Sequence, residues 1–124
     1  MFFVDDNKTI HITRGDMAVL SVGADNEGVD HVFTVGDVIR LQILKRNSCE
    51  DVILRKDVIV SGETTEVDIY LTKEDTTIGN IINRPTDYWY EIELNPDTAP
   101  QTLIGYDDVG AKIFKLYPEG GDVA

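Results

Sequence analysis

The chain has 124 residues, of which 42% are hydrophobic and 27% charged, and its formal net charge at pH 7 is −12. This length is typical of a single domain that buries its core without disulfides or metals. The acidic residues are spread along the whole chain, which argues against binding to nucleic acid or to an anionic membrane, because both need a concentrated positive field.

The N-terminus predicts that no signal peptide is present. Met1–Val4 is apolar but Asp5–Lys8 is polar, so there is no basic region, no long apolar stretch and no small-residue cleavage site. No apolar run approaches the length of a membrane span. The single cysteine, Cys49, excludes an internal disulfide and has no nearby His or second Cys with which to hold a metal.

Short runs of alternating apolar and polar residues, separated by turns rich in Gly, Asp and Asn, predict the strands of the first half of the chain. In one such run Val67, Ile69 and Leu71 share a face, which predicts one buried and one wet side. Val52–Val60 carries apolar residues at both ends and is either a two-sided central strand or a bend between two strands. The predicted strands are Lys8–Thr13, Met17–Ala24, Val32–Val35, Val38–Leu44, Val52–Val60 and Glu66–Leu71.

One short helix is predicted near residues 72–79. Thr72 offers an N-cap hydroxyl, and Asp75 stands three places on, where a capping box prefers Glu or Gln. Gly79 follows Ile78 as a residue that can end the helix. The segment is expected to bridge the ends of a sandwich.

The last third of the chain predicts a β-meander, because three alternating segments follow one another with turn residues between them. The segments are Tyr88–Leu94, Thr102–Tyr106 and Lys112–Tyr117. A period of two places Trp89, Glu91 and Glu93 on the face opposite the core residues Tyr88, Tyr90, Ile92 and Leu94. The whole pattern predicts an all-β domain, a β-sandwich over residues 1–120, with residues 121–124 as a flexible tail.

Two loop motifs suggest chemistry, and each has a simpler structural interpretation. Arg14-Gly15-Asp16 matches an integrin-adhesion tripeptide, but a tight turn between strands explains the glycine. The loop with Asp25, Asn26, Glu27 and Asp30 offers oxygens to a Ca²⁺ ion, but its spacing is not that of an EF-hand. A solvated hairpin turn is the favoured interpretation.

The titratable side chains show no catalytic arrangement. His11 and His31 lack a neighbouring Ser, Cys or carboxylate at a catalytic spacing, and they are interpreted as an outward-facing strand residue and a hairpin residue. Glu91 and Glu93 would need a pocket that raises one pKa, and two exposed carboxylates near Lys112 or Lys115 are favoured instead. We therefore expect no enzyme activity, no metal and no cofactor.

The aromatic residues are the best functional candidates. An outward Trp89 flanked by Tyr70 or Tyr106 would stack on a sugar or anchor a protein partner. If the strand is covered on both sides, Trp89 is instead a core residue. The sequence leaves these two interpretations open.

Several motifs carry a resemblance to known proteins, and the most specific are Thr13-Arg14-Gly15-Asp16, Tyr88–Glu93 and Ile104–Tyr106. Together with GDVIRLQI, VDIYLT and KIFKLYPEG they resemble small phage and prophage structural proteins from Gram-positive bacteria, a family similar to the N-terminal immunoglobulin-like domain of the phage baseplate upper protein. The resemblance covers about Thr9 to Gly120. The chain lacks the cysteine pair and the strand-C tryptophan of antibody domains, which excludes that subclass but not the sandwich.

The resemblance implies an immunoglobulin-like β-sandwich that docks onto other phage tail or baseplate proteins, or onto copies of itself, and carries no catalytic residues. Its place would be the virion, assembled in the host cytoplasm. The alternative is a carbohydrate-binding or adhesive module, which needs a row of exposed aromatics on one sheet face. Tail or portal genes on either side of its gene would decide between these classes.

Overall fold

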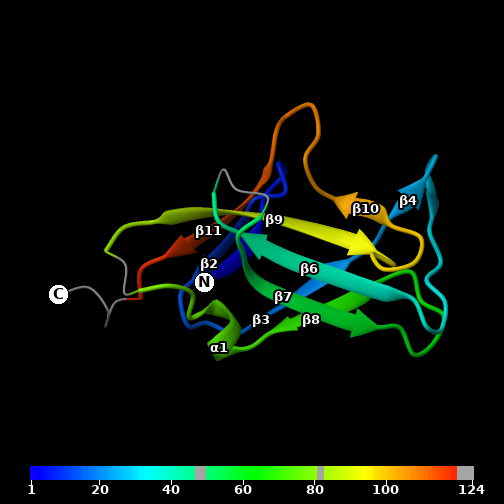
Figure 1. Cartoon of the computed structure of the whole chain (residues 1–124), viewed down its shortest axis with the longest axis horizontal. Coiled ribbons are helices and arrows are strands. Elements are labelled where there is room, and N and C mark those ends of the chain that lie inside the picture. The colour runs from blue at the N-terminus through cyan, green and yellow to red at the C-terminus, as the bar shows by residue number, and fades with distance from the viewer. Residues whose placement is uncertain (47–49, 81–82, 120–124) are drawn as a thin grey trace.

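The computed structural model describes residues 1–46, 50–80 and 83–119, and this part of the chain is all-β with one short helix, as predicted (Figure 1). The predicted tail at residues 121–124 lies outside the described residues. In chain order the elements are β1 (Phe2–Val4), β2 (Ile10–Thr13), β3 (Ala18–Val22), β4 (Asp25–Asn26), β5 (Val29–Asp30), β6 (Val38–Leu44), β7 (Val52–Ile59), β8 (Val67–Leu71), α1 (Lys73–Thr76), β9 (Thr86–Leu94), β10 (Gln101–Ile104) and β11 (Lys112–Tyr117).

The strands form a sandwich-like arrangement of two unequal layers. A seven-stranded sheet has the order β1-β2-β11-β9-β6-β7, with β10 also paired to β9. A two-stranded ribbon, β3 with β8, shares one hydrophobic core with it. Constant-type immunoglobulin domains divide their strands four and three. Because the division here is seven and two, the immunoglobulin-like subclass stays a prediction.

The core lies between these layers because alternate side chains of each strand point inward. Leu41 of β6, Ile69 of β8, Ile92 of β9 and Phe114 of β11 are fully buried. Burying a side chain of this kind stabilises the fold by about 1.5–3 kcal/mol. The alternation predicted for β8 and β9 is confirmed, and it turns the other face of the large sheet away from the core.

The predicted β-meander is wrong in its connectivity. β10 pairs with Leu94 to Ile92 of β9, and β11 pairs with Tyr90 to Thr86 of the same strand. Since β6 occupies the opposite edge of β9, β10 and β11 lie end to end along one edge. Residues 105–111 form a loop between them that rises away from the sheet (Figure 1, orange). Alternation determines which face a side chain takes, but it does not determine which strand lies beside it.

The segment Val32–Val35 is not a strand, contrary to the prediction. Phe33 makes an isolated bridge to Thr64. The regular pairing lies upstream, in the hairpin of β4 and β5, where Glu27 and Gly28 both adopt positive φ. The predicted hairpin turn in this acidic loop is therefore confirmed.

Two further strands refine the sequence-based picture. Residues predicted as Val52–Val60 form one strand, β7, at the edge of the large sheet, with a bulge in its pairing to β6 between Ile43 and Leu44. It is thus neither a central strand nor two strands. β1 is not predicted from the sequence, because three residues are too few to show a period.

The helix forms where its capping residues predict it. Thr72 accepts a hydrogen bond from the Asp75 N–H, and the Asp75 carboxylate accepts one from the Thr72 N–H, so Asp serves in the capping box. Asp75 also pairs with Lys56 of β7. This contact ties α1 to the edge of the large sheet.

Candidate functional site

The outer face of the large sheet carries an aromatic patch made of Trp89 and Tyr106. Trp89 points away from the core as predicted, and it is half-buried in register between Leu44 of β6 and Ile113 of β11. Tyr106 packs edge-on against it, with ring centroids 6.4 Å apart and planes at 68°. Because 78% of Tyr106 is exposed, the patch presents a large aromatic side chain to solvent, and the half-buried Trp89 ring restricts its position.

Gly105 brings the loop after β10 onto this face. A Cβ at position 105 would lie 2.6 Å from Thr102 Cγ2 and 3.9 Å from Glu91 Cβ. The first distance is shorter than packing allows, so the close turn depends on the missing side chain. The consequence is that Tyr106 follows directly and reaches Trp89.

Tyr70, the other predicted neighbour of Trp89, lies on a different layer. It is 61% exposed on β8, opposite Val19 of β3 in the ribbon. The sequence did not decide whether Tyr70 or Tyr106 flanks Trp89. The fold places Tyr106 against Trp89 and Tyr70 on the other layer. The three side chains do not form a single row on one face.

The lysines predicted beside Glu91 and Glu93 have other partners. Lys112 is buried and its Nζ lies 2.7 Å from Asp107 Oδ2, while Lys115 Nζ lies 3.8 Å from Asp87 Oδ1. The prediction of two exposed glutamates with Lys112 or Lys115 nearby across the strands is wrong, because these lysines stand opposite Tyr90 and Asp87 and both glutamates are half-buried. Glu91 and Glu93 follow Trp89 on the same face of β9, with Arg40 opposite Glu93, so acidic side chains border one side of the aromatic patch.

The environment of Glu91 changes the ionisation of its carboxyl group. Burial raises the pKa of Glu91, and the neighbouring charge of Glu93 raises it further. The turn at Gly105 lies beside Glu91, which explains why the Glu91 side chain is partly buried. A raised carboxyl pKa is also a property of general acids.

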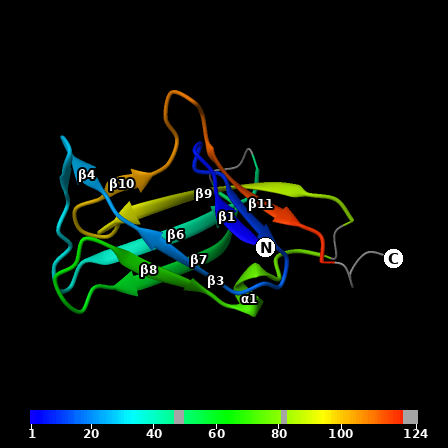
Figure 2. The same cartoon turned by 180° about the vertical axis from the view of Figure 1, so that it is seen from behind.

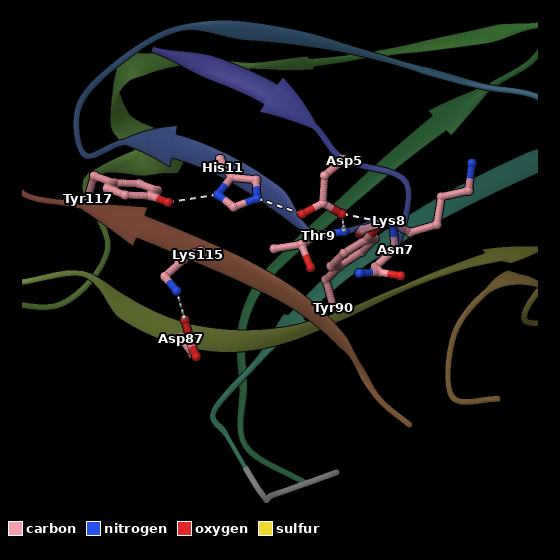
Figure 3. Close-up of polar contacts among 9 residues, drawn as sticks. All are labelled: Asp5, Asn7, Lys8, Thr9, His11, Asp87, Tyr90, Lys115 and Tyr117. Carbon is pink, nitrogen blue, oxygen red and sulfur yellow. Dashed lines mark hydrogen bonds and ion pairs between the residues drawn. The ribbon is translucent and has the colours of Figure 1, made fainter. Parts of the chain in front are cut away.

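His11 has polar partners that the sequence analysis missed, and Figure 3 shows them. Its Nδ1 lies 2.7 Å from the Tyr117 hydroxyl and its Nε2 lies 2.8 Å from Asp5 Oδ2, while its ring stacks on Phe3 at 4.2 Å. The hydrogen bond with His11 lowers the pKa of Asp5. The expectation that no carboxylate neighbours His11 is therefore wrong. Asp5 is six positions away, across a turn, and Tyr117 lies on β11, 106 positions away in the sequence.

This histidine cluster is a structural link rather than an open site. Both ring nitrogens of His11 are engaged, and the groove beside β10 that is described below is not lined by Asp5, His11 or Tyr117. The contacts join the turn after β1 to β2 and β11. His31, the second histidine, packs its ring edge-on against Phe33.

The loop motifs have structural roles. Arg14 is buried, and its guanidinium donates to the carbonyl oxygens of Ile78 and Gly79 at 3.3 and 3.1 Å, so it cannot serve as an exposed adhesion residue. The tight turn predicted there is confirmed by the hydrogen bond from Asp16 N–H to Thr13 O. Within residues 1–46, 50–80 and 83–119, no group of three His, Cys, Asp or Glu side chains is placed to hold a metal ion.

Cys49 lies outside the described residues. No helix in the described part of the chain is long and apolar enough to cross a membrane. No known protein family, curated protein or solved structure matches this chain.

Proposed function

We propose that this protein is a non-catalytic docking module that joins a larger protein assembly through the aromatic patch of Trp89 and Tyr106. The exposed Tyr106, held against a half-buried tryptophan, is the observation that carries the proposal. Tyrosine and tryptophan dominate the binding energy of many protein interfaces. The sequence resemblance favours a phage tail or baseplate as the assembly, so the proposed location of the protein is the virion.

The charge around the patch supports a specific partner rather than nonspecific association. The chain carries a net charge of −12, so copies of it repel one another at long range. The glutamates beside the patch are not neutralised by Lys112 or Lys115, which pair with aspartates instead. A partner with a basic rim around an apolar pocket complements this arrangement.

A glycan-binding role is less well supported. Sugars are held by aromatic side chains that offer flat faces, whereas Tyr106 meets Trp89 edge-on and Tyr70 lies on the other layer. The same patch is better suited to an apolar protein pocket. An enzyme is the least supported class, because His11 is occupied by Asp5 and Tyr117.

The decisive experiment compares Tyr106→Ala with the matched control Tyr70→Ala. Both remove an exposed tyrosine, from the aromatic patch and from the ribbon respectively. In virions produced from the source strain after prophage induction, we expect Tyr106→Ala to reduce incorporation of the chain at least tenfold and Tyr70→Ala to leave it unchanged. Both variants should melt near the wild-type temperature, because exposed side chains contribute little to stability.

Three results would contradict the proposal in different ways. Absence of the wild-type chain from virions would reject the phage assembly. Equal incorporation of both variants would reject the aromatic patch. For Trp89→Ala, unchanged incorporation would reject Trp89 as an anchor, whereas a melting temperature lowered by roughly ten degrees would assign it to the core.

A further inference from the structure

A second surface lies at the free edge of β10. β11 is flanked by β9 and β2, but among the described strands β10 pairs with β9 alone. Within the described residues, the main chain of Gln101–Ile104 makes no hydrogen bond outside its ladder with β9. An edge strand of this kind presents unpaired N–H and C=O groups that can accept another strand.

A groove opens along this edge, between the two layers. Its volume is about 1100 Å³ and all four residues of β10 line it. The opposite wall is formed by Gly23 and Ala24 after β3 and by Thr65 before β8. Figure 2 shows β10 and β4 beside one another at this end of the molecule. Lys8 also lines the groove, and its carbonyl accepts a hydrogen bond from the Tyr90 hydroxyl, which fixes the backbone there.

The groove has an apolar side and an acidic side. Leu103 and Ile104 are half-buried against the core, and Leu94 contributes to the lining. Asp25 and Asp30 stand directly opposite one another in the β4–β5 hairpin, and neither has an ion-pair partner among the described residues. Like charges placed in this way destabilise a hairpin, so a positively charged group between them would relieve the repulsion.

We propose that this groove binds an extended segment of a partner protein, in which apolar and basic residues alternate, as an additional strand beside β10. Main-chain hydrogen bonds to β10 would provide affinity, and alternate side chains would provide specificity. The apolar residues would face Leu103 and Leu94 while the basic ones face Asp25, Asp30 and Glu66. Four residues of β10 extend over roughly 13 Å, which sets the length of the paired segment.

A second copy of this chain is the less favoured occupant. Three carboxylates line the groove against a single lysine, and the chain as a whole carries a charge of −12. Two copies would bring like charges together as the strands approached. This inference is independent of the aromatic patch, since it uses a different edge and a different partner chemistry.

Three synthetic peptides test the proposal with the intact protein. The first has the sequence Lys-Val-Lys-Val-Lys-Val-Lys, the second replaces each lysine with glutamate, and the third replaces the central valine of the first with proline. Binding is followed by amide chemical shifts and amide hydrogen exchange. We expect the first peptide to shift and protect amides of β10, the glutamate peptide not to bind, and the proline peptide to bind at least tenfold more weakly, because proline lacks the N–H needed for pairing.

Two protein variants separate the groove from general electrostatic attraction. Asp30→Lys reverses one charge in the groove and creates an opposite-charge pair with Asp25, so the substitution does not destabilise the hairpin. Glu50→Lys makes the same change at an exposed position outside the groove lining. The first peptide should bind Asp30→Lys at least tenfold more weakly and Glu50→Lys with nearly wild-type affinity.

The proposal is overturned by any of three results of the peptide-binding experiments. These are equal binding of the proline peptide, shifts confined to residues away from β10, or equal weakening by Glu50→Lys and Asp30→Lys. Self-association of the free protein with protection of the same β10 amides would assign the groove to a second copy and would also overturn it. The variant Tyr106→Ala retains the groove, so peptide binding by this variant separates a failure here from a failure of the aromatic patch.

Discussion

β10 and β11 lie along the same edge of β9, yet their environments differ. Every second residue of β11 is buried, including Phe114 and Leu116, which are fully inaccessible. In β10, Gln101 and Thr102 are exposed and Leu103 and Ile104 only half-buried. Two features separate the strands. β2 covers the second edge of β11 while nothing in the described chain covers that of β10, and a bulge between Thr102 and Ile104 interrupts the pairing of β10 with β9. A strand's contribution to the fold thus depends on regular pairing and on its second neighbour as well as on its own alternation.

The largest effect is expected where β11 meets the core. Phe114→Ala removes a fully buried ring, and such substitutions cost about 3–5 kcal/mol of unfolding free energy. For a domain of this size that corresponds to a melting temperature lowered by roughly 10–20 °C. Calorimetry measures it, and a loss below about 1 kcal/mol would mean that β11 is no better anchored than β10.

The loop between the two strands has its own anchor, the pair of Lys112 and Asp107. Asp107→Asn leaves the buried Lys112 ammonium without its carboxylate, so we expect a loss of stability smaller than that of Phe114→Ala and larger than that of Leu103→Ala.

This loss depends on pH in a defined direction. The hydrogen bond with Lys112 lowers the pKa of Asp107, so its stabilisation is complete above the ordinary value of 3.8 and is lost as the pH falls through the lowered folded value. The melting difference between wild type and Asp107→Asn should therefore be full at pH 7 and disappear at strongly acidic pH. A difference that is independent of pH would contradict this account.

A smaller effect is expected in β10. Leu103→Ala shortens a half-buried side chain and should cost about 1 kcal/mol. Amide hydrogen exchange gives the matching observation, since β10 should exchange by local opening while β11 exchanges only on global unfolding. Equal protection of the two strands would remove the contrast between them.

The smallest effect is expected at Glu91, which lies opposite the junction of β10 and β11. Because burial raises its pKa, its carboxylate destabilises the fold at neutral pH, and stability is regained as the pH falls through the raised folded value. Glu91→Gln should raise the melting temperature at pH 7, within the roughly 0.5 kcal/mol usual for surface substitutions. At low pH, where Glu91 is protonated in the wild type, the two proteins should melt alike.

Local signals in the sequence predicted much of this fold. Val38–Leu44 forms β6 with the predicted bounds, because its alternation follows the Gly36-Asp37 turn directly. The capping residues Thr72 and Asp75 located the helix. The error in the meander has a physical cause, since two segments show the same alternation whether they lie side by side or end to end.

The candidate site was only partly predictable. The outward direction of Trp89 follows from period-two alternation, but the choice of Tyr106 over Tyr70 depends on which layer each strand joins. The cluster around His11 depends on Tyr117, which is 106 positions away along the chain. No local sequence pattern shows that these two residues are close in space. The groove beside β10 likewise forms only when the two layers pack together.

The parallel pairing of β2 with β11 has a consequence for biosynthesis. Ile10 aligns with Phe114, 104 positions later, so one edge of β2 stays unpaired until β11 has been synthesised. At about 5–20 residues per second this interval lasts roughly 5–20 s on the ribosome. During this time β2 can pair with β1 on one edge while its other edge stays unpaired. The closing of the large sheet around β11 is a slow, long-range event of the kind that limits folding rates.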